Sequence, residues 1–373
     1  MENERILYQL ASPDFSGNER KYLNDALDSG WISSRGAYIE RFENEFSRYI
    51  GSRYGIATSN GTSALHLAVM ALGIGEGDNV VVPNLTFAAS ANSVLYTGAR
   101  VKLIDVKISD FTLDTSLLER AIDKNTKAIM PVHLYGYPSD MDEILKIAKE
   151  HNLFVIEDCA ESLGAEYRGR KVGAIGDISI FSFYGNKIIT TGEGGMVLTN
   201  EENINERVRM LRDHGMDKII RYYHREIGYN YRMTNMQAAI GVAQLERIDT
   251  LIHRKDEIAS FYKRYLNQVQ EIELPQYIQN KRNVFWLYFV RIPHKKRPLL
   301  IERLKYFGID TRRFFYPLIE MPPYKDCEYI TDKDISHNLS LEGLNLPSGY
   351  NLVQENVEHI SQKIVSELEG ITI

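Results

Sequence analysis

The chain has 373 residues, enough for a large hydrophobic core and two domains. Hydrophobic residues make up 44% and charged residues 25% of it, as is typical of soluble globular proteins. A net charge of -6 does not favour nucleic-acid binding. With only two cysteines, the sequence excludes a disulfide framework and a cysteine-rich zinc site, and we predict no metal.

The N-terminal segment is charged and lacks the apolar core of a signal peptide, and no stretch reaches the length of a membrane span. We therefore expect a cytoplasmic protein without a membrane partner. Residues 16–19 have the pattern of a capping box, which predicts a helix start there, and Gly30 is expected to end that helix.

Short apolar runs then alternate with amphipathic stretches such as Met141–His151. Nearly continuous β-branched and apolar runs are typical of strands that are buried on both faces. The alternation predicts an α/β fold with a mostly parallel central sheet covered by helices. The expected strands are Asn79–Pro83, Val101–Val106, Ala128–His133, Leu153–Asp158, Ile178–Phe183 and Gly195–Thr199.

A long helical pattern from Met236 to Leu266 is expected to lead into a second domain. It is followed by a strand-like run at Asn283–Ile292 and a helical pattern at Leu299–Phe307. We predict a large domain at residues 1–250 and a smaller C-terminal α/β domain at 251–373.

Small residues around Gly61 and Thr62 precede a helical pattern at Ala64–Leu72. Free N–H groups and the helix dipole at such a start favour a phosphate. An ordinary helix cap explains the same residues, and this segment alone favours that simpler interpretation.

Asp158 ends an apolar strand, where its carboxylate would be desolvated unless a cation meets it. A protonated pyridine nitrogen is one such cation. A helix cap, a metal ligand or an internal salt bridge are equally good explanations of the aspartate.

Lys187 follows an aromatic strand end and precedes a glycine-rich turn. A lysine in crowded, partly apolar surroundings loses its proton more easily, and its amine can then attack an aldehyde. Ser182 is placed to reach the same phosphate as Thr62, and the paired glycines at 194–195 would let the backbone pass close to a bound ring. A lysine in a loop is more often a solvated surface residue, but these surroundings are not those of a solvated loop.

Three further features fit such a pocket less specifically. Phe87 could stack on a planar ring or simply belong to the core, and His133 could be a satisfied core histidine. Residues 228–232 are too polar and aromatic for a plain helix start and are otherwise a surface turn.

Taken in order, these motifs resemble the DegT/DnrJ/EryC1/StrS family of sugar aminotransferases. The resemblance runs through nearly the whole chain, and it rests on the set of motifs rather than on any single one. The motifs are Ser59-Asn60-Gly61-Thr62, Glu157-Asp158-Cys159-Ala160-Glu161, Phe181-Ser182-Phe183-Tyr184-Gly185-Asn186-Lys187, Thr191-Gly192-Glu193-Gly194-Gly195 and Gly228-Tyr229-Asn230-Tyr231-Arg232.

The resemblance implies an aspartate-aminotransferase-like fold (fold type I), pyridoxal 5'-phosphate (PLP) as cofactor, glutamate as amino donor and a homodimer with shared active sites. Lys187 would hold the cofactor as a Schiff base and move protons, and Asp158 would pair with the ring nitrogen. Glu161 would lie near the ring hydroxyl, and Phe87 would stack on the ring. The phosphate would be held by Gly61, Thr62, Ser182 and, from the partner subunit, Asn230.

Within the family, several segments resemble the GDP-perosamine synthase branch: Trp31-Ile32-Ser33-Ser34, Tyr184-Gly185-Asn186-Lys187, Val284-Phe285-Trp286-Leu287-Tyr288, Met321-Pro322-Pro323-Tyr324 and Gly343-Leu344-Asn345-Leu346-Pro347. This resemblance implies a nucleotide-linked 4-keto-6-deoxy sugar, GDP-4-keto-6-deoxymannose, as substrate and O-antigen (lipopolysaccharide) biosynthesis as the setting. Arg232, Arg312 and Tyr316 are the candidate substrate-binding residues. Members of that branch often carry Phe-His-Pro where this chain has Phe315-Tyr316-Pro317. The alternatives are a C3 or C4 aminotransferase for a dTDP- or UDP-linked keto sugar, and a PLP-binding protein without turnover.

Overall fold

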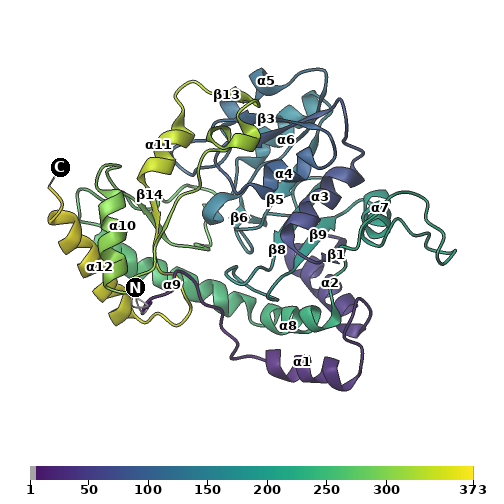
Figure 1. Ribbon diagram of the computed structural model, residues 1–373, viewed down its shortest axis with the longest axis horizontal. Helices are drawn as coiled ribbons and strands as arrows, with labels where there is room; N and C mark the ends of the chain where they lie inside the picture. Colours follow the sequence, from purple (N-terminus) through teal and green to yellow (C-terminus); the bar gives the residue numbers. More distant parts are fainter. Residues whose placement is uncertain (1–5, 373) are drawn as a thin grey trace.

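A computed structural model describes residues 6–372 of the chain (Figure 1). Its centre is an eight-stranded sheet in the order β1-β9-β8-β5-β4-β2-β3-β13. β9 runs antiparallel to β1 and β8, and the remaining neighbours are parallel. The prediction of a mostly parallel α/β sheet is therefore confirmed. The strands of this sheet are β1 (Tyr54–Thr58), β2 (Asn79–Pro83), β3 (Arg100–Ile104), β4 (Thr126–Ile129), β5 (Phe154–Asp158), β8 (Ile178–Ser182), β9 (Gly195–Thr199) and β13 (Glu328–Ile330).

Helices cover both faces of the sheet because successive strand residues point to opposite sides. Val80 and Val82 pack into one hydrophobic cluster, whereas Val81 between them belongs to the other. The first cluster also contains residues of α3, α4 and α7, and the second contains residues of α2, α6 and α8. The helices of this part are α1 (Glu19–Asp28), α2 (Ala37–Ile50), α3 (Gly61–Ala71), α4 (Ala89–Leu95), α5 (Leu118–Ala121), α6 (Met141–Glu150), α7 (Glu202–Arg212) and α8 (Asn235–Leu245).

A third hydrophobic cluster lies in the C-terminal part, on the left of Figure 1. It combines the helices α9, α10 and α12 with a three-stranded sheet in the order β11-β14-β12. β13 nevertheless joins the central sheet from this part of the chain, so the boundary at residue 250 stays a prediction. The elements are α9 (Ile248–Leu266), α10 (Arg297–Tyr306), α11 (Ile335–Glu342), α12 (Gln354–Glu369), β11 (Phe289–Arg291), β12 (Arg312–Arg313) and β14 (Gly343–Asn345), and a small separate sheet holds β6 (Glu166–Tyr167), β7 (Arg170–Lys171) and β10 (Lys281–Arg282).

Three local predictions differ from the structure. The single helix expected from Met236 to Leu266 is two helices, because the chain breaks between α8 and α9 at residues 246–247. The capping box at residues 16–19 does not form: Asn18 is the N-cap and makes no side-chain cap hydrogen bond, while the Ser16 amide donates to Asp14. The strand expected at Asn283–Ile292 shrinks to β11.

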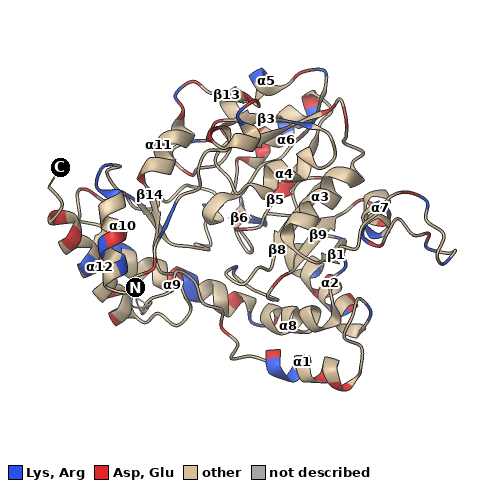
Figure 2. Cartoon of the chain, viewed as in Figure 1, with Lys and Arg blue, Asp and Glu red and all other residues tan. Residues whose placement is uncertain are grey.

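Basic and acidic side chains are interspersed over the helices and loops rather than gathered into one field of a single sign (Figure 2). Across residues 6–372, no helix has both the length and the apolar character that crossing a membrane requires.

Candidate active site

A cavity of about 780 Å³ opens at the carboxyl ends of β5 and β8, beside the first turn of α3. This is the edge of a parallel sheet at which ligands bind in α/β proteins. Its lining brings together eight of the residues predicted from the sequence, which come from segments far apart in the chain: Gly61, Thr62, Phe87, Asp158, Glu161, Ser182, Lys187 and Arg312.

Lys187 lies in the loop between β8 and β9, and its side chain is 13% exposed. Its Nζ lies 3.8 Å from the centre of the Trp286 ring and 3.5 Å from a carboxylate oxygen of Glu161. Burial lowers the pKa of the Lys187 amine, although the negative charge of Glu161 opposes that shift. The amine thus faces a cavity rather than bulk water and gives up its proton more readily than a surface lysine does.

Asp158 ends β5 with its side chain almost completely buried. One carboxylate oxygen accepts a hydrogen bond from the Ser90 hydroxyl at 2.7 Å, and the other accepts one from the Ala160 amide at 3.1 Å. Burial nevertheless raises the pKa of Asp158, and the charge of Lys187 is among the influences that lower it. The acid and the amine therefore interact within one cavity.

Glu161 is the second buried carboxyl group of the cavity. It accepts a hydrogen bond from the Tyr135 amide at 3.1 Å, and burial raises its pKa while Lys187 opposes the shift. A carboxyl group that is easily protonated can donate a hydrogen bond to an oxygen of a bound ring.

The first turn of α3 forms the other end of the cavity. Asn60 and Ser63 form a reciprocal capping box, so the cap interpretation of this segment is confirmed. Gly61 lies against Ser182, because a Cβ at position 61 would approach the Ser182 Cβ to 2.8 Å. A helix start next to two hydroxyl side chains, Thr62 and Ser182, is suited to a phosphate.

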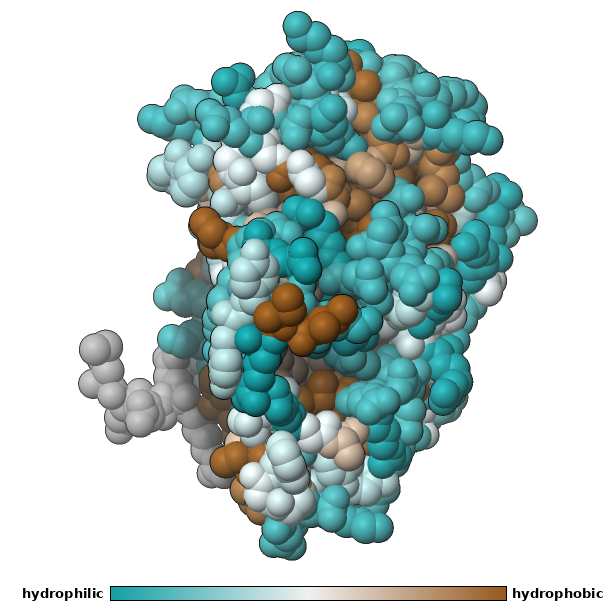
Figure 3. Space-filling model, turned by 90° about the vertical axis from the view of Figure 1, so that its right-hand side faces the viewer, coloured by the Kyte–Doolittle hydropathy of each residue, from teal (hydrophilic) through white to brown (hydrophobic). Residues whose placement is uncertain are grey.

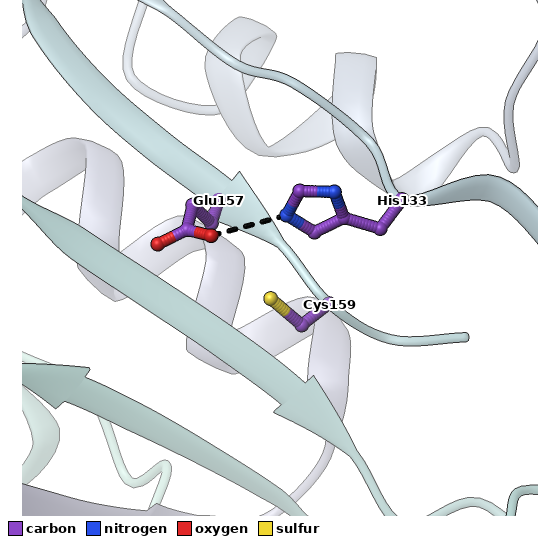
Figure 4. A group of neighbouring side chains, drawn as sticks. All are labelled: His133, Glu157 and Cys159. Atoms are coloured by element: carbon purple, nitrogen blue, oxygen red, sulfur yellow. Dashed lines mark hydrogen bonds and ion pairs between the residues drawn. The ribbon is translucent and has the colours of Figure 1, made fainter. Parts of the chain in front are cut away.

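Glu157, the residue before Asp158 in β5, does not line the cavity, and its carboxylate points toward His133 (Figure 4). Glu157 accepts hydrogen bonds from the amides of Gly173, Ile175 and Gly176 and lies 3.1 Å from His133 Nε2. His133 Nδ1 accepts a hydrogen bond from the Ser139 amide, which leaves the proton on Nε2, facing Glu157. Although Cys159 lies close enough to complete a metal-ligand trio, the histidine has both nitrogens in use. The alternative of a satisfied core histidine is confirmed.

Asn230, Arg232 and Tyr316 are absent from the lining of this cavity. Arg232 donates to Asn230 at 2.9 Å and forms an ion pair with Asp213. Tyr316 is half exposed, with the Arg313 guanidinium stacked on its ring. A Cβ on Gly195 would lie 2.5 Å from the Asn60 carbonyl oxygen and 2.6 Å from Thr58 Oγ1, so this glycine lets β9 pass close to the end of β1 and the turn after it. The expected passage of the glycine pair close to a bound ring stays a prediction.

Sequence reasoning missed Ser90 and Trp286 as site residues. Ser90 lies in α4, in a run of small residues that follows the buried strand β2, which is a usable signal. Trp286 lies about a hundred positions from Lys187 in the sequence, and no local pattern predicts that it reaches the site.

The cavity fits PLP by its own chemistry. Asp158 is a desolvated carboxyl group that a cationic ring nitrogen would stabilise in the ionised form. The start of α3 at Gly61, packed against Ser182, lines the cavity with donors for the phosphate, and Lys187 offers an amine with a lowered pKa for the aldehyde.

Comparison with known proteins agrees with this chemistry. GDP-perosamine synthase of Caulobacter vibrioides is 46% identical over 355 residues, covering 94% of this chain and 95% of that protein. GDP-perosamine synthase of Escherichia coli O157:H7 is also 46% identical, covering 94% and 96%. Among solved structures, S. venezuelae DesV in complex with a ketimine intermediate has a TM-score of 0.89 at 34% identity, covering 95% of both chains. Helicobacter pylori PseC, an aminotransferase involved in pseudoaminic acid biosynthesis, has a TM-score of 0.92 at 25% identity, covering 98% and 100%.

The sequence profile described as the DegT/DnrJ/EryC1/StrS aminotransferase family matches residues 13–365. The expectations of this family, of its fold and of PLP as cofactor are thereby confirmed. Since the match spans nearly the whole chain and the cavity carries the residues that the chemistry needs, the chain belongs to the DegT/DnrJ/EryC1/StrS aminotransferase family.

Proposed function

We propose that this chain transfers an amino group from glutamate to C4 of GDP-4-keto-6-deoxymannose and so produces GDP-perosamine. The observation that carries the reaction type is the amine of Lys187, which is buried against Trp286 in the cavity that Asp158 also lines. The sugar is inferred from the relatives that bear the name GDP-perosamine synthase. The cytoplasmic location stays a prediction.

When bound, PLP supplies an aldehyde that reacts with amines and a ring that takes up negative charge. We assign Lys187 to the aldehyde, Asp158 to the ring nitrogen and Glu161 to the ring hydroxyl. Gly61, Thr62 and Ser182 would hold the phosphate, and Phe87 at the cavity rim would lie against the ring.

The protein itself contributes Lys187, whose amine can carry protons between the reacting groups. Burial lowers the pKa of Lys187, so a larger fraction of its amine is neutral at physiological pH than in an exposed lysine. A neutral amine can take the α-proton of the amino donor and return a proton to the sugar carbon in the second half of the reaction. Arg312 lines the same cavity, and its guanidinium is the candidate partner for a carboxylate of the donor or a phosphate of the nucleotide.

The homodimer is supported by the connection between α7 and α8, which projects from the body on the right of Figure 1. Ile219 and Ile227 there are 90% and 84% exposed. Figure 3 looks onto this side of the molecule and shows hydrophobic groups at the surface among hydrophilic ones. Apolar side chains of this kind favour burial against another surface. In a second copy of the chain, the same connection would bring Asn230 and Arg232 to the neighbouring active site.

Borohydride reduction of the purified protein, followed by peptide mapping, tests the cofactor assignment. A PLP adduct on Lys187 is expected, and an adduct on another lysine would refute it. Incubation with glutamate should convert the bound cofactor to its amine form, whereas bound PLP without this half-reaction would favour a protein without turnover.

A panel of keto sugars tests the substrate. GDP-4-keto-6-deoxymannose should give product at the highest kcat/KM, and the product should carry nitrogen at C4. A preference for a dTDP- or UDP-linked sugar, or amination at C3, would replace this substrate assignment while leaving the reaction type intact.

A further inference from the structure

A second buried lysine lies near the site without lining the cavity. Lys255 of α9 is 3% exposed. Its Nζ donates to the Ser348 carbonyl at 2.6 Å and to the Trp286 carbonyl at 3.1 Å, and it lies 4.6 Å from the centre of the Tyr350 ring. Burying an amine is costly unless its N–H groups are bonded, and an apolar residue at this packed position would leave the two carbonyl oxygens without a donor.

The two segments that Lys255 joins are the ones that hold the Lys187 loop. The Trp286 indole donates to the carbonyl of Asn186 at 2.7 Å, and the Tyr350 hydroxyl donates to the carbonyl of Ile188 at 2.6 Å. The carbonyl groups of the two residues on either side of Lys187 are therefore each bonded by an aromatic donor. Lys255 bonds the backbone of one of these aromatic residues and contacts the ring of the other.

The indole has a second contact that makes this arrangement relevant to chemistry. Its ring is the surface on which the Lys187 amine rests, at 3.8 Å. A shift of the 286 backbone would therefore change both the anchor of the loop and the environment of the amine.

We propose that Lys255 is a positioning residue for Lys187, which acts by fixing Trp286 and Tyr350 on the two carbonyls that flank it. This inference rests on the proposed role of Lys187 as the cofactor lysine. The Lys255 amine donates at a point where carbonyls of two chain segments meet, and an apolar side chain of equal length would leave both carbonyls without this donor.

The test is Lys255→Met in the full-length protein, which keeps the length of the side chain and removes its donors. We expect hydrogen exchange of the amides at 184–190 to accelerate by about tenfold and PLP to dissociate about tenfold more readily, as the loss of one or two hydrogen bonds implies. The pH midpoint of the visible absorbance of the bound cofactor should also shift, because the environment of the Lys187 amine changes.

Lys296→Met is the matched control. Lys296 is another largely buried lysine that bonds a carbonyl, that of Leu368, and it pairs with Glu271, but it lies away from the 187 loop. This variant should lose stability without changing the exchange at 184–190, the cofactor affinity or the absorbance midpoint. Tyr350→Phe deletes only the hydroxyl that bonds the Ile188 carbonyl and should reproduce part of the Lys255→Met effect.

The inference is overturned if Lys255→Met lowers the melting temperature but leaves all three of those readouts at their wild-type values. Should Lys255→Met fail to fold, unchanged readouts in Tyr350→Phe would overturn it equally. An adduct mapped to a different lysine in the wild-type protein would refute the role of Lys187 instead, and the exchange data would still decide whether Lys255 orders the loop.

Discussion

Lys187 and Lys255 are two buried lysines that both contact Trp286, the first at its ring and the second at its backbone carbonyl, yet their surroundings differ. Lys187 rests on the ring of Trp286 and faces a cavity with two carboxyl groups, Asp158 and Glu161. Lys255 donates to the backbone carbonyl of Trp286 and is buried, with its amine against Ser348 and Tyr350.

Burial lowers the pKa of both amines, to about 7 in Lys255. A depressed pKa alone therefore does not identify a catalytic lysine. The two lysines differ in whether a ligand can reach the amine and in whether carboxyl groups lie near it. Lys187 can meet a ligand in the cavity, and Glu161 and Asp158 respond to its charge, whereas the partners of Lys255 within the described residues are carbonyl oxygens and an aromatic ring.

The same substitution at the two lysines should give the largest contrast. Lys187→Met is expected to abolish covalent attachment of PLP and to slow the half-reaction with glutamate by at least about 10³-fold, since nucleophile and proton carrier are lost together. Lys255→Met should retain the covalent bond. Single-turnover absorbance and mass spectrometry after borohydride reduction measure both effects, and circular dichroism should show that Lys187→Met stays folded. A Lys187→Met variant that keeps most of the wild-type rate would refute the role of Lys187 as nucleophile and proton carrier.

Asp158→Asn should have the next largest effect. An amide cannot carry the negative charge that keeps a ring nitrogen protonated, so the half-reaction with glutamate should slow by about 10²-fold. The amide oxygen can still accept from the Ala160 amide, and the NH₂ group can donate to the Ser90 hydroxyl oxygen, whose proton can turn to Thr86, so the free energy of unfolding should change little. Stopped-flow absorbance gives the rate, and chemical denaturation gives the stability.

The adjacent residue of β5 provides the control. Burial opposes ionisation of Glu157, but His133 and the backbone amides outweigh it and lower the pKa of that carboxyl group. In Glu157→Gln, an NH₂ group would face amide donors, which should cost about 2 kcal/mol of stability while the half-reaction stays near the wild-type rate. A loss of rate without a loss of stability in this variant would contradict the assignment of the two carboxyl groups to opposite sides of the strand.

Lys255 should make the stability of the folded protein depend on pH. Its pKa is about 7 in the folded protein against an ordinary value of 10.5. Between these values the unfolded chain holds a proton that the folded protein has released, so raising the pH favours folding. Below them both states are protonated, and this group adds no pH dependence. The wild-type protein should therefore gain about 2 kcal/mol over Lys255→Met between about pH 7 and about pH 9. Urea denaturation of both proteins measures it, and a constant difference would contradict a lowered pKa.

Features of the structure that depend on local sequence patterns could be predicted, and features that depend on distant contacts could not. The buried strands and the residues that end them, such as Asp158 and Ser182, were predictable because apolar runs and their ends are local signals. The contacts of Lys255 could not be predicted, because its partners lie some 30 and 90 positions away in the sequence and its own segment has the pattern of an ordinary helix. The break between α8 and α9 was missed for a related reason: the apolar periodicity continues across residues 246–247.

The smallest effects should separate the candidate substrate residues. Arg312→Ala is expected to raise the KM for the donor or the sugar by about tenfold, because it removes charge-assisted hydrogen bonds from a residue of the cavity. Tyr316→His restores the residue that the resembled branch often carries but acts at a half-exposed ring packed under Arg313, so KM and sugar preference should change by less than about twofold. Steady-state kinetics with each keto sugar measures both. A switch of sugar preference in Tyr316→His would mean that this ring reaches the substrate in the assembled enzyme, and that the cavity of a single chain is only part of the specificity pocket.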